Sequence, residues 1–123
     1  MPPTNRKESS SQAVNEAWLV RNCPFSYTLA QLGRRWRPAI LWKLREGPLH
    51  LAELARRLPR ASEKMLTQEL RALAEAGLVE RRDEASKVVY ALSSRAVELA
   101  PVLAAMHAFG ERHRHEAPGP VEG

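Results

Sequence analysis

The chain is most constrained between residues 51 and 77, where two short helical patterns follow each other and proline and glycine mark their ends. Apolar residues of the first pattern recur on one face as far as Pro59, which cannot continue a helix. Ser62 is suited to cap a second helix, and Gly77 is suited to end it. Two helices joined by a tight turn are therefore predicted.

The second of these helices has two separable faces. Leu66, Leu70 and Leu73 recur at i, i+4 and i+7 and predict one buried stripe. The opposite face carries side chains that can meet phosphates and base edges, although every amphipathic helix has a polar side and a solvated face is the simpler interpretation of periodicity alone. These side chains are Lys64, Thr67, Gln68 and Arg71.

Beyond Gly77 the pattern changes to that of strands, at residues 78–79 and again at residues 88–92, with a charged segment between them. Two such strands predict a hairpin with a basic tip. Its candidate phosphate contacts are Arg81, Arg82 and Lys87, which Asp83 and Glu84 partly offset. The predicted fold class is mainly α with a small β-hairpin wing: a winged helix-turn-helix with further helices at both ends.

The other segments complete one predicted domain over residues 12–116. We expect helices over residues 12–22 and 94–115, whose apolar faces need a partner, and mobile tails over residues 1–11 and 117–123. Residues 28–33 predict a short helix that Gly33 ends in a left-handed conformation. Arg37 and Pro38 open another helix, in which the proline lies in the first turn.

Charge and composition narrow the class of protein. The 123 residues are 44% hydrophobic, which is enough for one core. The net charge of +5 is concentrated in residues 34–92, which hold 13 Lys and Arg against 8 Asp and Glu. This distribution favours a polyanion as partner. A membrane span and a secretory signal are not predicted, so the expected location is the cytoplasm.

The cysteine and histidine content argues against disulfide, metal and catalytic sites. Cys23 is the single cysteine, so an intrachain disulfide is impossible, which leaves a buried thiol, a reactive thiol or a bridge between subunits. A thiolate near Arg21 would be a candidate redox sensor. His113 and His115 lie two residues apart and face different directions on a helix. We predict no metal, no cofactor and no enzyme activity, since no nucleophile motif or glycine-rich phosphate loop is present.

Three motifs together resemble the HxlR-type branch of the MarR-like winged-helix transcriptional regulators, over about residues 23–109. The first contains Cys23-Pro24, Tyr27-Thr28-Leu29, Gly33 and Trp36. The second and most specific contains Glu53-Leu54, Pro59, Ser62, Lys64-Met65-Leu66-Thr67, Leu70, Leu73, Gly77-Leu78-Val79 and Arg81. The third is Val89-Tyr90-Ala91-Leu92-Ser93.

The resemblance implies a homodimer whose terminal helices pair and whose helix at residues 62–76 enters the major groove of double-stranded DNA. The wing at residues 81–87 would then reach the adjacent backbone or minor groove. Arg35 and Arg37, which precede a helix, are candidate phosphate contacts. Ser62 would cap the recognition helix and is a candidate phosphate contact as well.

The predicted function is a sequence-specific transcriptional regulator that binds a pseudo-palindromic promoter operator. A winged helix used for protein–protein contact is the alternative, and DNA binding that does not depend on salt would favour it. The release signal is open between oxidation of Cys23 and a small-molecule effector held near Trp18, Trp36 or Trp42, which otherwise belong to the core or the dimer interface.

Overall fold

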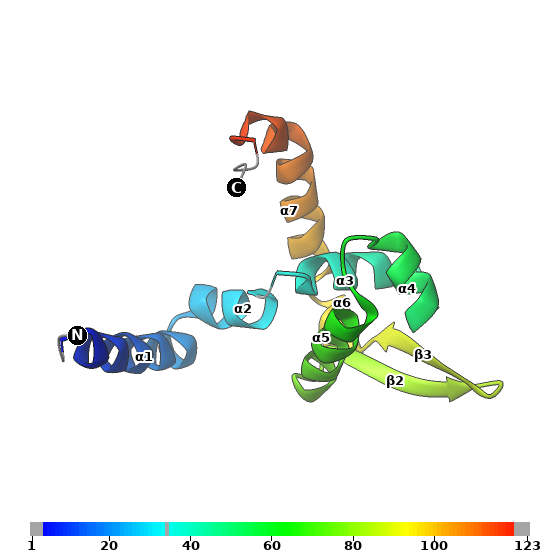
Figure 1. The fold of residues 1–123 in the computed structure, drawn as a ribbon, viewed down its shortest axis with the longest axis horizontal. Coiled ribbons are helices and arrows are strands. Elements are labelled where there is room, and N and C mark those ends of the chain that lie inside the picture. Colours follow the sequence, from blue (N-terminus) through cyan, green and yellow to red (C-terminus); the bar gives the residue numbers. More distant parts are fainter. Residues whose placement is uncertain (1–3, 34, 120–123) are drawn as a thin grey trace.

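Helices at both ends of the chain flank a helix-turn-helix and a β-hairpin in the computed structural model, which describes residues 4–33 and 35–119 (Figure 1). The predicted fold class is confirmed. In chain order the elements are α1 (Thr4–Asn22), α2 (Pro24–Leu32), α3 (Arg37–Leu44), β1 (Leu49–His50), α4 (Leu51–Arg57), α5 (Glu63–Glu75), β2 (Val79–Glu84), β3 (Lys87–Leu92), α6 (Ser94–Val97), α7 (Ala100–His113) and a 3-10 turn (Arg114–Glu116).

The core lies where α3, α4 and α5 meet the base of the hairpin. All three leucines of the predicted stripe on α5, Leu66, Leu70 and Leu73, are at most 1% exposed, as the helical period requires. They join Ile40 and Leu41 of α3, which are fully buried. Because this packing covers only the inner face of α5, the outer face stays open to solvent.

The wing is a three-stranded antiparallel sheet in the order β1-β3-β2. Its two long strands continue through most of the charged segment that separates the two predicted strands, and only Ala85 and Ser86 form the turn, with φ of 49° and 67°. A two-residue turn with positive φ matches the twist of the flanking strands. The ladder therefore extends to the tip, where Glu84 pairs with Lys87.

The N-terminal helices begin earlier than the sequence pattern indicates. Helix α1 starts at Thr4, so residues 4–11 are helical and the predicted tail is wrong there; residues 1–3 lie outside the described part. Residues 4–11 contain no proline or glycine that would end a helix, so the helix continues through them without an apolar stripe. Helix α2 starts at Pro24, ahead of the predicted start at residue 28, because a proline is tolerated in the first turn of a helix.

Gly33 ends α2 for a different reason from the one predicted. Its φ is −72°, so the expected left-handed conformation is wrong. A Cβ at this position would lie 2.6 Å from the carbonyl oxygen of Leu29. Glycine is needed here because the chain approaches the last turn of its own helix closely.

The predicted helix over residues 94–115 is interrupted. Pro101 lies in the first turn of α7, and a proline disfavours a continuous helix through the residues before it. The chain therefore forms α6, bends at residues 98–99 and continues as α7. Residues 117–119 lie outside any helix, and the rest of the expected C-terminal tail, residues 120–123, lies outside the described part.

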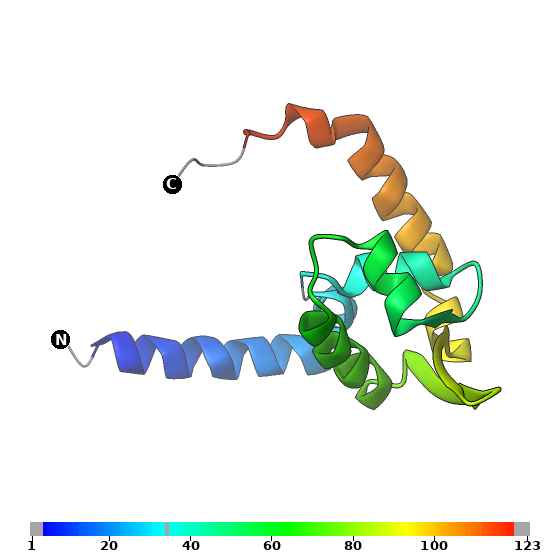
Figure 2. The ribbon, with the colours of Figure 1, turned by 45° about the vertical axis from the view of Figure 1, so that its right-hand side comes forward.

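Helices α1 and α7 project from the helix-turn-helix and the wing (Figures 1 and 2). Both carry large apolar side chains that are exposed. Trp18 of α1 is 61% exposed and Phe109 of α7 is 62% exposed. Only Leu103 of α7 is buried. Exposed apolar surface of this kind is typical of sites that bind a protein partner, a membrane or a ligand.

Candidate nucleic-acid interface

The outer face of α5 presents its polar side chains to solvent. Lys64, Gln68 and Arg71 are exposed, whereas Thr67 is half-buried at the flank of the helix. Ser62 caps the helix as predicted, since its Oγ accepts a hydrogen bond from the N–H of Met65 at 3.1 Å. The predicted contact residues on this helix are thus gathered on one side of a well-capped element.

Arg37 differs from the other predicted backbone contacts because its guanidinium is already occupied. Its Nε donates to Oε1 of Glu69 on α5 at 2.8 Å, and the two side chains are only 15% and 23% exposed. Arg35, in the turn before α3, is exposed. The sequence pattern does not distinguish the two arginines because their partners cannot be read from neighbouring residues.

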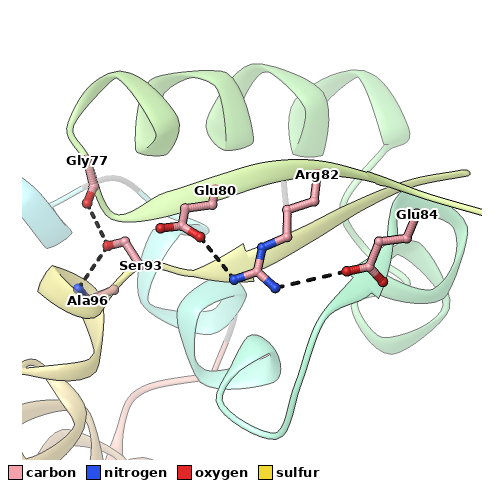
Figure 3. A network of polar contacts seen from close by, with 6 residues as sticks. All are labelled: Gly77, Glu80, Arg82, Glu84, Ser93 and Ala96. Carbon is pink, nitrogen blue, oxygen red and sulfur yellow. Dashed lines mark hydrogen bonds and ion pairs between the residues drawn. The ribbon is translucent and has the colours of Figure 1, made fainter.

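The wing arginines point to opposite sides of the hairpin. In Figure 3, Arg82 lies on the side away from α5, between Glu80 at 3.0 Å and Glu84 at 4.0 Å. Strand alternation places Arg81 on the other side, the side of α5. Lys87 is exposed at the start of β3. The expected pairing of a wing arginine with acids is present, with Glu80 in place of Asp83.

This arrangement separates the contributions of two adjacent arginines. Replacing Arg81 by Ala is expected to weaken DNA binding about three- to tenfold per bound subunit and to reduce the salt slope by roughly one phosphate contact for each subunit. Replacing Arg82 by Ala, which removes the same charge from the opposite face, is expected to change affinity less than twofold. Fluorescence anisotropy at several salt concentrations measures both, and equal losses would contradict the assignment of faces.

Ser93 joins the recognition helix to the end of the wing, a role that the sequence pattern does not assign. Its buried Oγ donates to the carbonyl oxygen of Gly77 at 2.6 Å and accepts from the N–H of Ala96 at 3.1 Å (Figure 3). Ser93 is therefore the N-cap of α6 and also satisfies the last turn beyond α5. Its position after a strand and before a helical pattern is a signal for this role.

Cys23 is the half-buried N-cap residue of α2. The backbone N–H of Ser26 and then the Ser26 hydroxyl lower the pKa of the thiol below its ordinary value, with a smaller contribution from the N–H of Phe25. The expected influence of Arg21 is not among the causes of this lowered pKa. The start of a helix, which favours the thiolate, supplies the effect.

A cavity of about 360 Å³ lies between α3 and α7. Trp42 forms one wall, and its indole stacks on the His107 ring at 4.5 Å between centroids. The Arg45 guanidinium lies 3.7 Å from the centre of the Trp42 ring. Leu103 and Met106 of α7 line the other side, with Lys43 as the cationic group. Such a space suits a small, largely apolar molecule.

Neither a cluster of metal-binding side chains nor a membrane-spanning helix is found among the described residues. Within residues 4–33 and 35–119, no three His, Cys, Asp or Glu side chains are grouped as a metal site would require. Over the same part of the chain, every helix is too short or too polar to cross a bilayer.

Comparisons with known proteins show which family this chain resembles. Residues 31–118 match the family described as HxlR-like helix-turn-helix. The regulatory protein MalR of Fusobacterium mortiferum is 36% identical over 95 residues, which span 74% of this chain and 90% of that protein.

Two solved structures of redox-related regulators have the same fold. The reduced form of the redox regulator HypR superposes with a TM-score of 0.69 at 30% identity, covering 74% of this chain and 93% of that one. Reduced YodB of Bacillus subtilis has a TM-score of 0.66 at 29% identity, and the match covers 78% of this chain and 98% of the YodB chain. YodB has also been solved in a quinone-bound form.

Proposed function

Because the chain belongs to the HxlR-like helix-turn-helix family of transcriptional regulators, we propose that it binds a promoter operator as a homodimer. Helix α5 enters the major groove of each half-site, and the Arg81 side of the wing follows the neighbouring backbone. Lys64, Gln68 and Arg71 contact base edges and phosphates, while Thr67 lies at the margin. Half-sites are then spaced by about one turn of DNA, roughly 34–36 Å.

The observation that carries this proposal is the division of α5 into two faces. Its leucine stripe is at most 1% exposed, whereas Lys64, Gln68 and Arg71 on the opposite face are exposed. A polar helix face that only contacts water would not need a basic hairpin next to it, whereas the wing packs against α5. The names of relatives such as MalR and YodB, which describe regulators, support the same role.

Selection from a library of random duplexes tests the proposal and identifies the operator in the same experiment. The expected result is an enriched pseudo-palindrome that the protein binds at least about a thousandfold more tightly than unrelated duplex. Its affinity should fall steeply as salt rises. Failure to enrich any sequence, or binding that ignores salt, would favour the alternative of a protein–protein module.

The homodimer is proposed to form through the exposed apolar faces of α1 and α7. In an isolated protomer Trp18 and Phe109 are more than half exposed to water, which is unfavourable for large apolar side chains. Light scattering after gel filtration should give twice the chain mass of 13.8 kDa. Replacing Phe109 by Glu should shift the mass toward one chain and weaken operator binding, while a mass of 13.8 kDa for the unaltered protein would contradict the dimer.

A thiol signal at Cys23 is the first proposed means of release. The low thiol pKa favours addition of the thiolate to an electrophile such as a quinone, whose ring takes up the proton as the C–S bond forms. An organic hydroperoxide gives the other product: with one cysteine per chain, it takes two electrons and two protons from the thiols of two subunits, which become joined by a disulfide, and is itself reduced to an alcohol and water. The quinone-bound form of the neighbour YodB supports the first of these products.

The pH dependence of Cys23 alkylation tests whether the pKa of the thiol is lowered in the folded protein. Since its pKa is lowered, the rate with iodoacetamide should rise and reach half of its maximum at a lower pH than in the same chain unfolded in urea. Replacing Ser26 by Ala removes the hydroxyl and keeps the N–H, so it should move the midpoint only part of the way back. A folded-state midpoint at or above the unfolded one would contradict the assignment.

A small aromatic effector in the cavity beside Trp42 is the second proposed means of release. Its binding between α3 and α7 would bias the position of the dimer helices relative to α5. Naphthalene-type probes that quench Trp42 fluorescence and weaken operator binding would support it. The Trp42→Phe variant should lose the quenching, and quenching that persists there would place the probe at another tryptophan.

A further inference from the structure

The ion pair between Arg37 and Glu69 joins two elements that are far apart in the sequence. Arg37 is the first residue of α3, and Glu69 lies in the middle of α5, 32 residues later. Their contact is 2.8 Å long, and both side chains are mostly shielded from water. A charge-assisted hydrogen bond in such a setting is stronger than the more exposed ion pair of Arg82 with Glu80, whose side chains are 46% and 50% exposed.

Glu69 occupies a special place around the axis of α5. Helical periodicity puts it on one flank of the buried leucine stripe and puts Thr67 on the other flank. Both are half-buried, in agreement with that placement. Lys64, Gln68 and Arg71 lie on the outer face between the two flanks. A restraint on the Glu69 flank therefore controls the rotation of the face that carries the groove contacts.

The apolar contacts of α5 do not supply this restraint by themselves. Leu66 and Leu70 share a core with Ile40 and Leu41 of α3, and hydrophobic burial is proportional to area and has no preferred direction. A small rotation of α5 can retain most of that buried area. Hydrogen bonds to base edges, in contrast, depend steeply on distance and angle.

We propose that the Arg37–Glu69 pair fixes the rotation of α5, so that Arg37 is a positioning residue for DNA recognition and not a phosphate contact. The inference rests on the proposed function, because it concerns the fidelity of groove contacts made by α5. It also assigns Glu69, an acid on the recognition helix, a favourable role in binding a polyanion.

Replacing Glu69 by Gln distinguishes the two roles of Arg37 by the sign of the effect. If the pair positions α5, Glu69→Gln should raise the Kd for the selected operator about three- to tenfold, with an unchanged salt slope and little effect on unrelated duplex. If Arg37 contacts a phosphate, its release from Glu69 should lower the Kd for both duplexes. That second result would overturn the inference.

Glu75→Gln is the matched control. Glu75 is the last residue of α5 and is exposed, and its replacement removes the same charge from the same helix without touching the pair. Its Kd should fall slightly for both duplexes because one repulsive charge is gone. A Glu69→Gln variant that behaves like Glu75→Gln would show that Glu69 acts only through its charge.

A DNA-free measurement keeps this inference distinct from the proposed function. Residual dipolar couplings of folded protein report the orientation of α5 relative to α3, which should change in Glu69→Gln and return in the charge-swapped Arg37→Glu/Glu69→Arg protein. An unchanged orientation in Glu69→Gln would overturn the inference even if operator binding is normal. An unaltered protein that selects no operator would instead refute the proposed function. If Glu69→Gln does not fold, the charge-swapped protein is measured against the unaltered one, and a loss of operator binding there would overturn the inference.

Discussion

Replacing Arg71 by Ala should weaken operator binding by about tenfold to a hundredfold per half-site while leaving the fold intact. Arg71 is exposed on the outer face of α5, and a guanidinium there can form a bidentate contact with a guanine or a phosphate. Loss of a base contact costs about 1–3 kcal/mol and relaxes the sequence preference at one position of each half-site. In a dimer the variant loses the contact in both half-sites, so the tenfold to hundredfold loss applies to each half-site and the two losses multiply.

Anisotropy titrations against the selected operator and its single-base variants measure this effect. Arg82→Ala is the matched control, since it removes an exposed arginine from the side of the wing that faces away from α5. The control should keep the sequence preference and lose affinity less than twofold. A loss for Arg71→Ala that is equal on every sequence would identify a phosphate contact, and no loss at all would remove Arg71 from the interface.

The parts of the site that could be predicted from the sequence are those with local causes. The N-cap role of Ser62, the end of α5 before Gly77 and the buried leucine stripe each depend on residues within a few positions of one another. Capping preferences and helical periodicity act at that range. Gly77 is left-handed with φ of 77°, as such a helix end requires.

The parts that could not be predicted depend on contacts between distant segments or on strand register. No local pattern links Arg37 to Glu69, and the direction of Arg82 follows from where the hairpin turns. A shift of the turn by one residue would have exchanged the faces of Arg81 and Arg82. Pro101 is a local signal for the break before α7, yet the apolar periodicity on both sides conceals it.

Helix α5 has both roles: its inner face packs in the core, and its outer face forms part of the proposed interface. The separation is sharp because Leu66 is fully buried and its neighbours Lys64 and Gln68 are exposed. Substitutions on the two faces should therefore have separable effects. A substitution on the outer face should change the affinity for DNA and leave the free energy of unfolding unchanged. A substitution on the inner face should lower the free energy of unfolding.

Replacing Leu66 by Ala should lower the free energy of unfolding by about 2–5 kcal/mol, because it removes buried methyl groups and leaves a cavity among Ile40, Leu41 and Leu70. For a domain of this size the melting temperature should fall by roughly 10–20 °C. Urea unfolding followed by circular dichroism measures the first quantity, and a thermal scan measures the second. Gln68→Ala, on the same helix, should change stability by less than about 0.5 kcal/mol. A Leu66→Ala protein as stable as the unaltered chain would mean that α5 does not pack through this face, and the assignment of its outer face to DNA would fail with it.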